Sequence, residues 1–290
     1  MTKTYDNRPC SCQDDDSHRK LFHATGGTVS FQKLLNSMFK RDSTKPKLVS
    51  DSDETLGLKS TEGDEQLTAD QKQVWEQSQK FELDFWTKQW TASFAEKNGR
   101  KLTIDEIIEN RQQAGRWFLE SFGICVRGDL SSDTFVGNVL EVGCGPVGFF
   151  EKFSHIDVHG IDSLMAQYAS NLFFSSLGQR NNYSYSSTSL KDIRSNEYDW
   201  IVCSNVLDHT ENYKLFLKEM LRVAGKRGSI LLVTDCREKS EPGHAQIFSP
   251  GQVIDYVARH GYYIDFCKVG QPLHADEGAF GLYAKIRRAH

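Results

Sequence analysis

The sequence predicts an α/β fold in which a doubly wound, mostly parallel sheet of seven strands follows an N-terminal helical lid. Two observations favour this fold. Beyond Ser131, short apolar segments alternate with segments of helical spacing, as successive β-α-β units require. The first apolar segment runs into a glycine-rich turn, Gly143 to Gly148, and the second ends at an acidic residue, Asp162. Both features are typical of sheets that bind a ligand at their carboxyl edge.

The composition divides the chain into parts. Residues 1–66 are polar and include a run of acidic side chains, so we expect a flexible tail with at most one short helix. Residues 67–290 are expected to form one domain, with the helical lid over residues 67–130 and the α/β core over residues 131–290.

Two helices are expected in the lid. Apolar and aromatic side chains recur at spacings of about four between Val74 and Phe94, which predicts an amphipathic helix. Its aromatic face, including Trp86, is expected to pack on the core, although it could also supply an apolar wall to a bound substrate. The second helix begins at a T-x-x-E capping box, Thr103 and Glu106, and runs towards Gly123.

The core follows from short apolar runs bounded by turn residues. The expected strands are 138–142, 157–161, 183–185, 200–204, 229–234, 262–269 and 280–286, of which the last two resemble a hairpin. The helices expected between them are 148–153, 163–177, 213–223 and 250–260.

Bulk properties exclude several classes of partner. The net charge of −4 over 290 residues does not favour nucleic acid. The longest apolar runs are too short to span a bilayer and the N-terminus lacks the apolar stretch of a secretion signal, so we expect a cytoplasmic protein without a membrane partner. The cysteines of the core are expected to be buried thiols, namely Cys125, Cys144, Cys203, Cys236 and Cys267. Cys10 and Cys12 are expected to be incidental residues of the tail rather than zinc ligands.

The glycine turn and its acidic neighbours point to a nucleoside derivative as ligand. Gly143 and Gly145 let the backbone approach a ligand closely, and Asp162 stands where a carboxylate can accept hydrogen bonds from both ribose hydroxyls. The G-x-G-x-x-G spacing alone also fits a dinucleotide, so an NAD-dependent dehydrogenase is an alternative. Glu141 disfavours the dehydrogenase. This carboxylate could orient the turn and contact a cationic amino-acid group, but it would make no favourable interaction with a pyrophosphate.

Over roughly residues 105–290 the sequence resembles the class I S-adenosylmethionine-dependent methyltransferases. The resemblance is carried by the loop VLEVGCGPVGFF, the segments SLKDI and YDWIVCSNVLDHT, and the stretch LFLKEMLRVAGKRGSILLV. It implies S-adenosylmethionine as cofactor, with the glycine loop around its methionine portion, an acid on the ribose and a further acid on the adenine. The residues implied in this binding are Glu141, Gly143, Cys144, Gly145, Asp162, Ser163, Asp192, Asn205 and Asp208.

The same resemblance implies a small acceptor molecule, with a hydroxyl group of a sugar or natural product as the site of O-methylation. A general base helps such a reaction, and His209 and His244 are the candidates, while Asp235 could bind substrate hydroxyls and Trp86 could line the acceptor side. Methyl transfer from a sulfonium needs no metal in principle, and none is expected. A non-catalytic protein that keeps the cofactor site is the second alternative.

Overall fold

The computed structural model describes residues 69–89, 99–100, 103–126, 132–170, 183–239, 243–270 and 279–289. The chain divides into two units, residues 1–40 and 41–290, and every described residue belongs to the second. The expected tail, residues 1–66, lies outside the described residues, as do Trp90 and Phe94 of the first expected helix.

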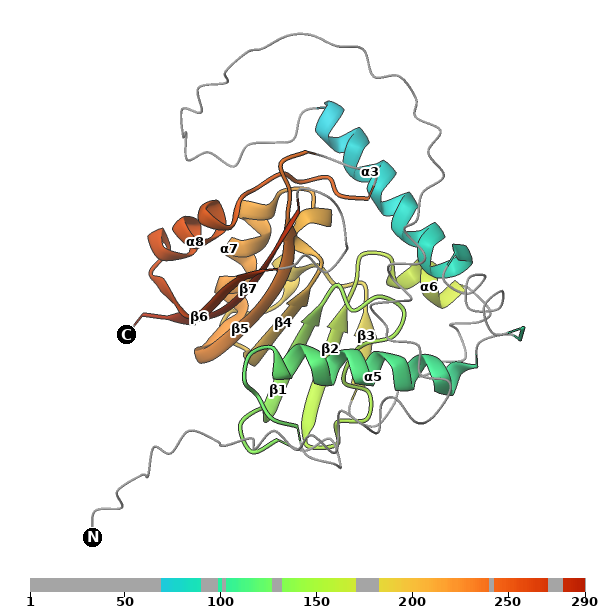
Figure 1. Cartoon of the computed structure of the whole chain (residues 1–290), viewed down its shortest axis with the longest axis horizontal. Helices are drawn as coiled ribbons and strands as arrows, with labels where there is room; N and C mark the ends of the chain where they lie inside the picture. Colours follow the sequence, from blue (N-terminus) through green and yellow to red (C-terminus); the bar gives the residue numbers. More distant parts are fainter. Residues whose placement is uncertain are drawn as a thin grey trace. The chain divides into compact units, whose positions relative to one another are not determined.

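The centre of the molecule is a seven-stranded sheet in the order β3-β2-β1-β4-β5-β7-β6 (Figure 1). Its strands are β1 Gly137–Val142, β2 Ile156–Ile161, β3 Tyr183–Ser186, β4 Tyr198–Ser204, β5 Ala224–Cys236, β6 Tyr262–Gly270 and β7 Phe280–Arg288. The first five pair in parallel, whereas β7 pairs antiparallel with both β5 and β6. The predicted doubly wound, mostly parallel sheet is confirmed.

The strand order places a ligand site between β1 and β4. From β1 the chain winds outward through β2 to β3, and it then returns to add β4 and β5 on the other side. In sheets with this winding, the loops after two such neighbouring strands leave towards opposite faces, and ligands bind in the crevice between them at the carboxyl edge. Gly143 follows β1 and Asn205 follows β4, so the two segments with the strongest sequence signals meet there.

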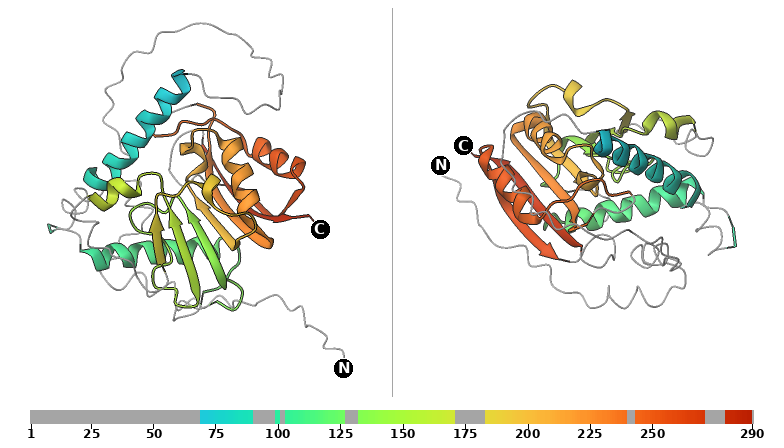
Figure 2. Two further views of the ribbon diagram at one scale, coloured as in Figure 1. Left: turned by 180° about the vertical axis from the view of Figure 1, so that it is seen from behind. Right: turned by 90° about the horizontal axis from the view of Figure 1, so that it is seen from above.

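Apolar side chains cover both faces of the sheet. One face carries Leu140, Ile201 and Leu232, which pack with α7 Tyr213–Val223 and α8 Pro250–Arg259. The other carries Val139, Val202 and Leu231, which pack with α5 Ile104–Glu120 and with a group of phenylalanines, Phe118, Phe149, Phe150 and Phe153. The helices accordingly lie on two sides of the sheet in Figure 2.

Local signals placed two helix starts correctly. Thr103 and Glu106 form both hydrogen bonds of a capping box at the start of α5, as predicted. Ser249 and Gln252 form a second capping box at α8, where Pro250 occupies a first-turn position that needs no N–H donor. The helix expected at residues 163–177 is represented by α6 Met165–Ser170, and residues 171–182 lie outside the described residues.

The helix expected at residues 148–153 is wrong. These residues form turns and irregular backbone instead, and Phe149 donates its N–H to the Glu141 carboxylate. Helix α5 approaches so closely here that a Cβ on Gly115 would lie 2.7 Å from the Phe149 carbonyl oxygen. The free energy gained by burying Phe149, Phe150 and Phe153 outweighs the helix propensity of this segment. The glycine turn is therefore not followed by the N-terminus of a helix, whose free N–H groups could have bound a ligand.

The expected lid region, residues 67–130, contains two described helical segments, α5 and, before it, α3 Ala69–Asp84, which continues as a turn of π-helix, η1 Phe85–Gln89. We call α3 together with η1 the lid. Figure 1 shows α3 crossing above the carboxyl ends of the parallel strands. Among the described residues, no helix is both long and apolar enough to cross a membrane. The expectation of buried core thiols holds for Cys144, Cys203 and Cys236 and is wrong for Cys125 and Cys267, which are exposed: Cys125 follows α5, and Cys267 lies on the edge strand β6.

Candidate functional site

The glycine turn after β1 has the backbone conformation that its glycines predict. Gly143 and Gly145 have φ values of 66° and 65°, in the left-handed region that disfavours side chains. A Cβ on Gly143 would lie 2.2 Å from Cγ2 of Val206, in the loop after β4. The two loops that flank the crevice are therefore in direct contact, and only glycine fits at their meeting point.

Asp162 fastens the end of β2 to the glycine turn. Its Oδ2 accepts the N–H of Gly145 at 2.9 Å and its Oδ1 accepts the N–H of Leu164 at the same distance. Burial raises the pKa of this carboxyl group to about 6, against the lowering effect of the two N–H donors. Each carboxylate oxygen can accept a further bond, so the group can still receive ligand hydroxyls.

Glu141 lies beneath the turn rather than beside an open pocket. The Phe149 N–H reaches both of its oxygens at 3.0 Å, and the Tyr183 hydroxyl donates to Oε2 at 2.7 Å. The side chain is 2% exposed, and burial raises its pKa to about 7. Glu141 is thus hydrogen-bonded to the segment that follows the turn, and its expected contact with a cationic ligand group remains a prediction.

Arg111, on α5, is a site residue that the sequence interpretation missed. Its Nε donates to the Val147 carbonyl at 2.8 Å, and its Nη2 reaches the Cys144 carbonyl at 3.4 Å. The guanidinium lies 4.1 Å from the centre of the Phe149 ring. A signal existed, because Arg111 occupies the apolar stripe formed by Ile107, Ala114 and Phe118, where a charged residue has no structural use unless it meets a partner.

Trp86 lies over the glycine turn. Two carbons of its ring would be 3.5 Å from a Cβ on Gly145, and its Nε1 donates to Glu82 at 2.8 Å. The same helical lid meets the other half of the crevice, since a Cβ on Gly243 would lie 2.9 Å from the Phe81 ring. One continuous helical segment therefore contacts both the glycine turn and the loop that carries His244.

Other predicted cofactor residues have different surroundings. Ser163 is exposed, and its hydroxyl donates to Gln79 of α3 at 2.7 Å, which ties the lid to the end of β2. Cys144 is buried and burial raises its thiol pKa, so it packs beneath the turn. Asp192 is exposed at the end of η3 Leu190–Asp192, a short helix that follows β3. These roles in cofactor binding remain predictions.

The loop after β4 brings the remaining candidates together. Asn205 adopts a positive φ of 55°, donates its N–H to the Val233 carbonyl at 2.7 Å and holds its side-chain amide nitrogen 3.2 Å from Nε2 of His209. A short helix, η4 Leu207–His209, then presents Asp208 and His209. The non-glycine left-handed conformation is the kind of backbone strain found at functional sites.

Asp208 is the centre of a buried polar cluster. It is completely buried, and Nδ1 of His244 lies 2.5 Å from its Oδ2. The Asp208 pKa is held below its ordinary value, because His209, His244 and Arg237 together outweigh the effect of burial. The rings of His209 and His244 are 4.5 Å apart. The structure thus brings together two predicted catalytic histidines that are separated by 35 residues in sequence.

Asp235 is also completely buried, and it pairs with Arg237 rather than facing open space. The Nη2 of Arg237 lies 3.4 Å from Asp235, and its Nε lies 3.8 Å from Asp208. Arg237 was not singled out from the sequence, where it follows β5 without a motif. Whether Asp235 contacts a substrate hydroxyl remains a prediction.

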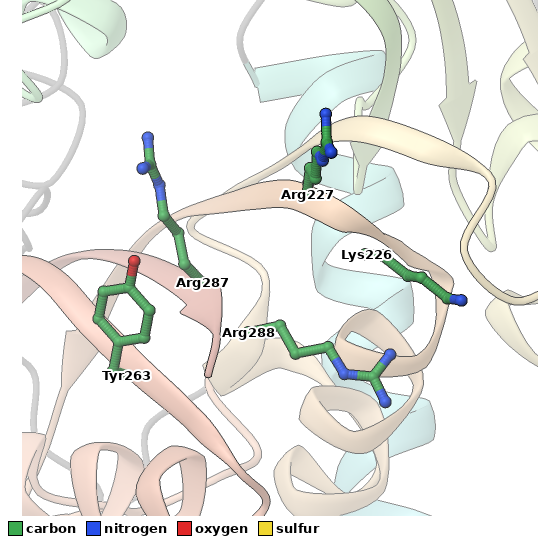
Figure 3. Close-up of a pocket in the computed structure, with 6 residues that line it drawn as sticks. Lys226, Arg227, Tyr263, Arg287 and Arg288 are labelled. Atoms are coloured by element: carbon green, nitrogen blue, oxygen red, sulfur yellow. The ribbon is translucent and has the colours of Figure 1, made fainter. Parts of the chain in front are cut away.

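A pocket at the opposite edge of the sheet, where the parallel strands begin, is separate from this site. It is lined by Lys226, Arg227, Gly228, Tyr263, Arg287 and Arg288, which come from the start of β5, the start of β6 and the end of β7 (Figure 3). Because β5 runs parallel to β1 and β4, its start lies at the amino edge, opposite the glycine turn. This basic pocket does not contribute to the candidate site.

Comparison with known proteins identifies the region of the glycine turn. Residues 140–232 match the family model described as a methyltransferase domain. The match covers the turn, Asp162, Asn205, Asp208 and His209, and it ends before Asp235 and His244. No curated protein matches the chain.

Several solved structures are similar to the chain at low identity. A SAM-dependent methyltransferase from Aquifex aeolicus is 21% identical over 61% of this chain and 96% of its own, with a TM-score of 0.41. The N-methyltransferase NodS from Bradyrhizobium japonicum, in complex with S-adenosyl-L-homocysteine, is 21% identical over 65% and 89%, with a TM-score of 0.44. The 1,6-didemethyltoxoflavin-N1-methyltransferase of Burkholderia thailandensis is 13% identical over 79% and 94%, with a TM-score of 0.47. At these scores the substrates of those proteins carry no argument for this chain.

Proposed function

We propose that this chain, an S-adenosylmethionine-dependent methyltransferase by its methyltransferase domain at residues 140–232, methylates a hydroxyl group of a small molecule such as a sugar or natural product. The observation that carries the proposal is the position of the Asp208–His244 pair. It lies after β4 and β5 at the carboxyl edge, the edge to which the glycine turn also belongs. The domain match disfavours the dehydrogenase that the glycine spacing left open.

The residues of the glycine turn fit the cofactor. Gly143 and Gly145 supply the left-handed conformation of a turn that presents backbone to the ligand, and Asp162 presents a carboxylate that keeps accepting capacity for ribose hydroxyls. Arg111 donates hydrogen bonds to the carbonyl oxygens of Cys144 and Val147, which helps the turn to keep its shape when no ligand is bound. Glu141 supports the same turn through the Phe149 N–H.

When bound, the cofactor supplies a methyl group on a positively charged sulfur, which an acceptor oxygen attacks in line. The task of the protein is to hold that oxygen opposite the sulfur and to keep water out. The lid serves the second requirement, because Trp86 and Phe81 contact the two halves of the crevice.

The two histidines are placed to handle the hydroxyl proton. His244 is oriented by Asp208, whose Oδ2 lies 2.5 Å from Nδ1, and with Nδ1 protonated its Nε2 is the nitrogen that would accept a proton from a substrate. His209 lies beside it, at a ring distance of 4.5 Å. A carboxylate that fixes the tautomer of a histidine is the arrangement by which proteins prepare an imidazole for proton transfer.

The experiment that tests the proposed acceptor class uses S-adenosylmethionine with an isotopically labelled methyl group. The full chain is incubated with matched pairs of small molecules that differ only in carrying a hydroxyl or an amine at one position, and the label is located by mass spectrometry. Transfer to the hydroxyl members is expected. Transfer confined to the amine members would show that the reaction is N-methylation and would overturn the proposed acceptor.

A further inference from the structure

We propose that Asp208, His209 and His244 form a binding site for one divalent transition-metal ion, which would hold the acceptor hydroxyl for methyl transfer. The role in transfer rests on the proposed function, whereas the metal site itself does not. This differs from the expectation of a metal-free enzyme, because the tertiary structure assembles a ligand set that the sequence leaves dispersed.

The geometry is that of a three-ligand site. One carboxylate oxygen and one nitrogen from each imidazole lie within 4.8 Å of one another. Oδ1 of Asp208 is 3.8 Å from Nε2 of His209, and Oδ2 is 2.5 Å from Nδ1 of His244. Ligand atoms at about 2.0–2.2 Å from a common ion are separated by roughly 3–4 Å, so small side-chain rotations suffice to bring the three around one ion.

The backbone holds the two halves of this cluster together. His244 lies in the segment after β5, and the N–H of Gln246 donates to the Asp208 carbonyl at 3.0 Å. The same segment forms a β-bridge between Arg237 and Phe248. The ligand set is therefore prepared before any ion arrives, which lowers the entropic cost of binding.

Two buried carboxylates lie at or next to the cluster of Asp208, His209 and His244. Asp208 and Asp235 are both completely buried, and Arg237, which is 5% exposed, lies between them. Histidine binds metal as the neutral imidazole, so an ion at this site would add positive charge beside two buried carboxylates. Burial of a carboxylate costs less when it coordinates a metal, which favours a cation at Asp208.

The second nitrogen of His209, Nδ1, is not the one that lies 3.8 Å from Asp208. Nδ1 is buried and has no hydrogen-bond partner among the described residues, whereas buried imidazole nitrogens are normally satisfied. A flip of the ring would present Nδ1 in place of Nε2, so His209 can offer an unsatisfied nitrogen to the ion. The amide of Asn205, at 3.2 Å from Nε2 of His209, could turn to offer its oxygen as a fourth ligand, because the two amide atoms are interchangeable by rotation.

The ligand chemistry selects the class of ion. Two imidazole nitrogens and one carboxylate suit Zn²⁺, Mn²⁺, Fe²⁺ or Co²⁺, whereas Mg²⁺ and Ca²⁺ prefer sites made of oxygen atoms alone. Three protein ligands leave at least one position open, which is the property of catalytic rather than structural sites.

In the reaction, the open position would take the acceptor hydroxyl. Coordination would lower the pKa of the hydroxyl, so that its proton could pass to water instead of to a histidine. The ion would also displace the proton shared by Nδ1 of His244 and Asp208, because a metal ligand must be deprotonated. A lone pair of the resulting oxygen forms the new O–CH₃ bond as the C–S bond breaks, and the electron pair of that bond stays on sulfur. The sulfonium thus becomes a neutral thioether, and charge is balanced without an oxidant or reductant.

Metal binding is tested directly, without substrate or cofactor. The full chain, freed of metal with a chelator, is titrated with Co²⁺ while the visible absorption of bound Co²⁺ is recorded, and the affinity for Mn²⁺ and Zn²⁺ is measured by calorimetry. We expect one ion per chain at this site. His209→Gln and His244→Gln should each weaken binding at least about 10-fold, since even residues that merely support a metal ligand contribute on that scale.

Two control variants make the result specific. His260→Gln makes the same change at an exposed histidine outside the cluster and should leave metal binding intact. Cys12→Ser tests whether the cysteines of the N-terminal segment bind the ion, which thiolate absorption bands of Co²⁺ would also reveal. Circular dichroism of each variant confirms that it is folded, and His244→Asn offers a second neutral replacement if His244→Gln is unstable.

The outcomes separate this proposal from the proposed function. Absence of Co²⁺, Mn²⁺ and Zn²⁺ binding, or binding that His209→Gln and His244→Gln leave unchanged, would overturn the metal site even if methyl transfer to hydroxyls is observed. Metal binding lost in those variants, together with a chain that methylates only amines, would support the site and reject the proposed acceptor. Loss of hydroxyl methylation on chelation, with cofactor binding retained, supports both.

Discussion

The guanidinium of Arg111 donates to the carbonyl oxygen of Val147 over 2.8 Å, and so joins the lid-proximal helix α5 to the last part of the glycine turn. The two residues are 36 positions apart in sequence. Since Arg111 also lies against the rings of Phe149 and Trp86, one buried cation contacts the turn, its supporting segment and the lid. Arg111, which stabilises the glycine turn, therefore lies outside residues 140–232, the range that matches the methyltransferase domain.

Replacement of Arg111 by methionine should lower both stability and cofactor affinity. The side chain keeps its apolar stem but loses hydrogen bonds from a charged group to two buried carbonyls, which is expected to cost about 2–3 kcal/mol in the free energy of unfolding. Urea denaturation and calorimetry with S-adenosylmethionine measure the two effects. Arg116→Met, on the same helix but half-buried, is the control, and equal losses in both variants would contradict the assigned role of Arg111.

Asp162→Ala should weaken cofactor binding by about 1–3 kcal/mol, because it removes the anchor of the Gly145 N–H and the acceptor proposed for two ribose hydrogen bonds. Calorimetry with S-adenosylmethionine gives the value. Asp157→Ala removes an exposed carboxylate from β2, the strand that Asp162 follows, and should leave the affinity unchanged. If the two variants bind the cofactor equally well, Asp162 does not hold the ribose.

Gly143→Ala should destabilise the turn for two separable reasons. The new methyl group meets Val206 at 2.2 Å, and alanine is strained by roughly 1–2 kcal/mol at a φ of 66°. The double variant Gly143→Ala/Val206→Ala relieves the contact but not the strain, so it should recover part of the lost stability. A double-mutant cycle from thermal unfolding measures the coupling, and strict additivity would exclude the predicted contact.

The buried Glu141 should make stability depend on pH. Its pKa rises from 4.5 to about 7 on folding, so between these values the folded protein binds more protons than the unfolded chain, and stability falls as pH rises through this window. The loss should reach about 3 kcal/mol. Glu141→Gln should flatten the profile from pH 4.5 to 7 in urea denaturation. Asp162, with a pKa raised from 3.8 to about 6, acts in the same direction at lower pH and remains in that variant.

Trp86→Ala opens the lid over the glycine turn. We expect acceptor KM to rise more than thermal stability falls, because the ring is only partly buried yet lies against Gly145. Steady-state kinetics and thermal unfolding provide the comparison. Trp117→Ala, at an exposed tryptophan of α5, serves as the matched control. A loss of stability without a change in KM would assign Trp86 to packing alone.

The strands, the capping boxes and the glycine turn could be predicted from the sequence because each depends on residues close together in the chain. Alternation of apolar runs indicated all seven strands, and left-handed glycines indicated the turn. The helix expected after the turn failed for a tertiary reason. A helical pattern was present, but α5 packs at Gly115 and draws three phenylalanines into the core, so the segment follows the shape of its neighbours rather than its own propensity.

The sequence by itself thus determined the class of fold, the glycine loop that is proposed to bind the cofactor and the chemical types available to the site. Only the tertiary structure decided which of those groups act together. Glu141 accepts the N–H of Phe149 beneath the loop, and Arg111 of α5 donates to a carbonyl of the loop. Asp208 contacts His244, which is 36 positions away in sequence. The order of the strands in the sheet determines which of these residues contact one another, because it brings distant loops to one edge. No local pattern of residues contains that information.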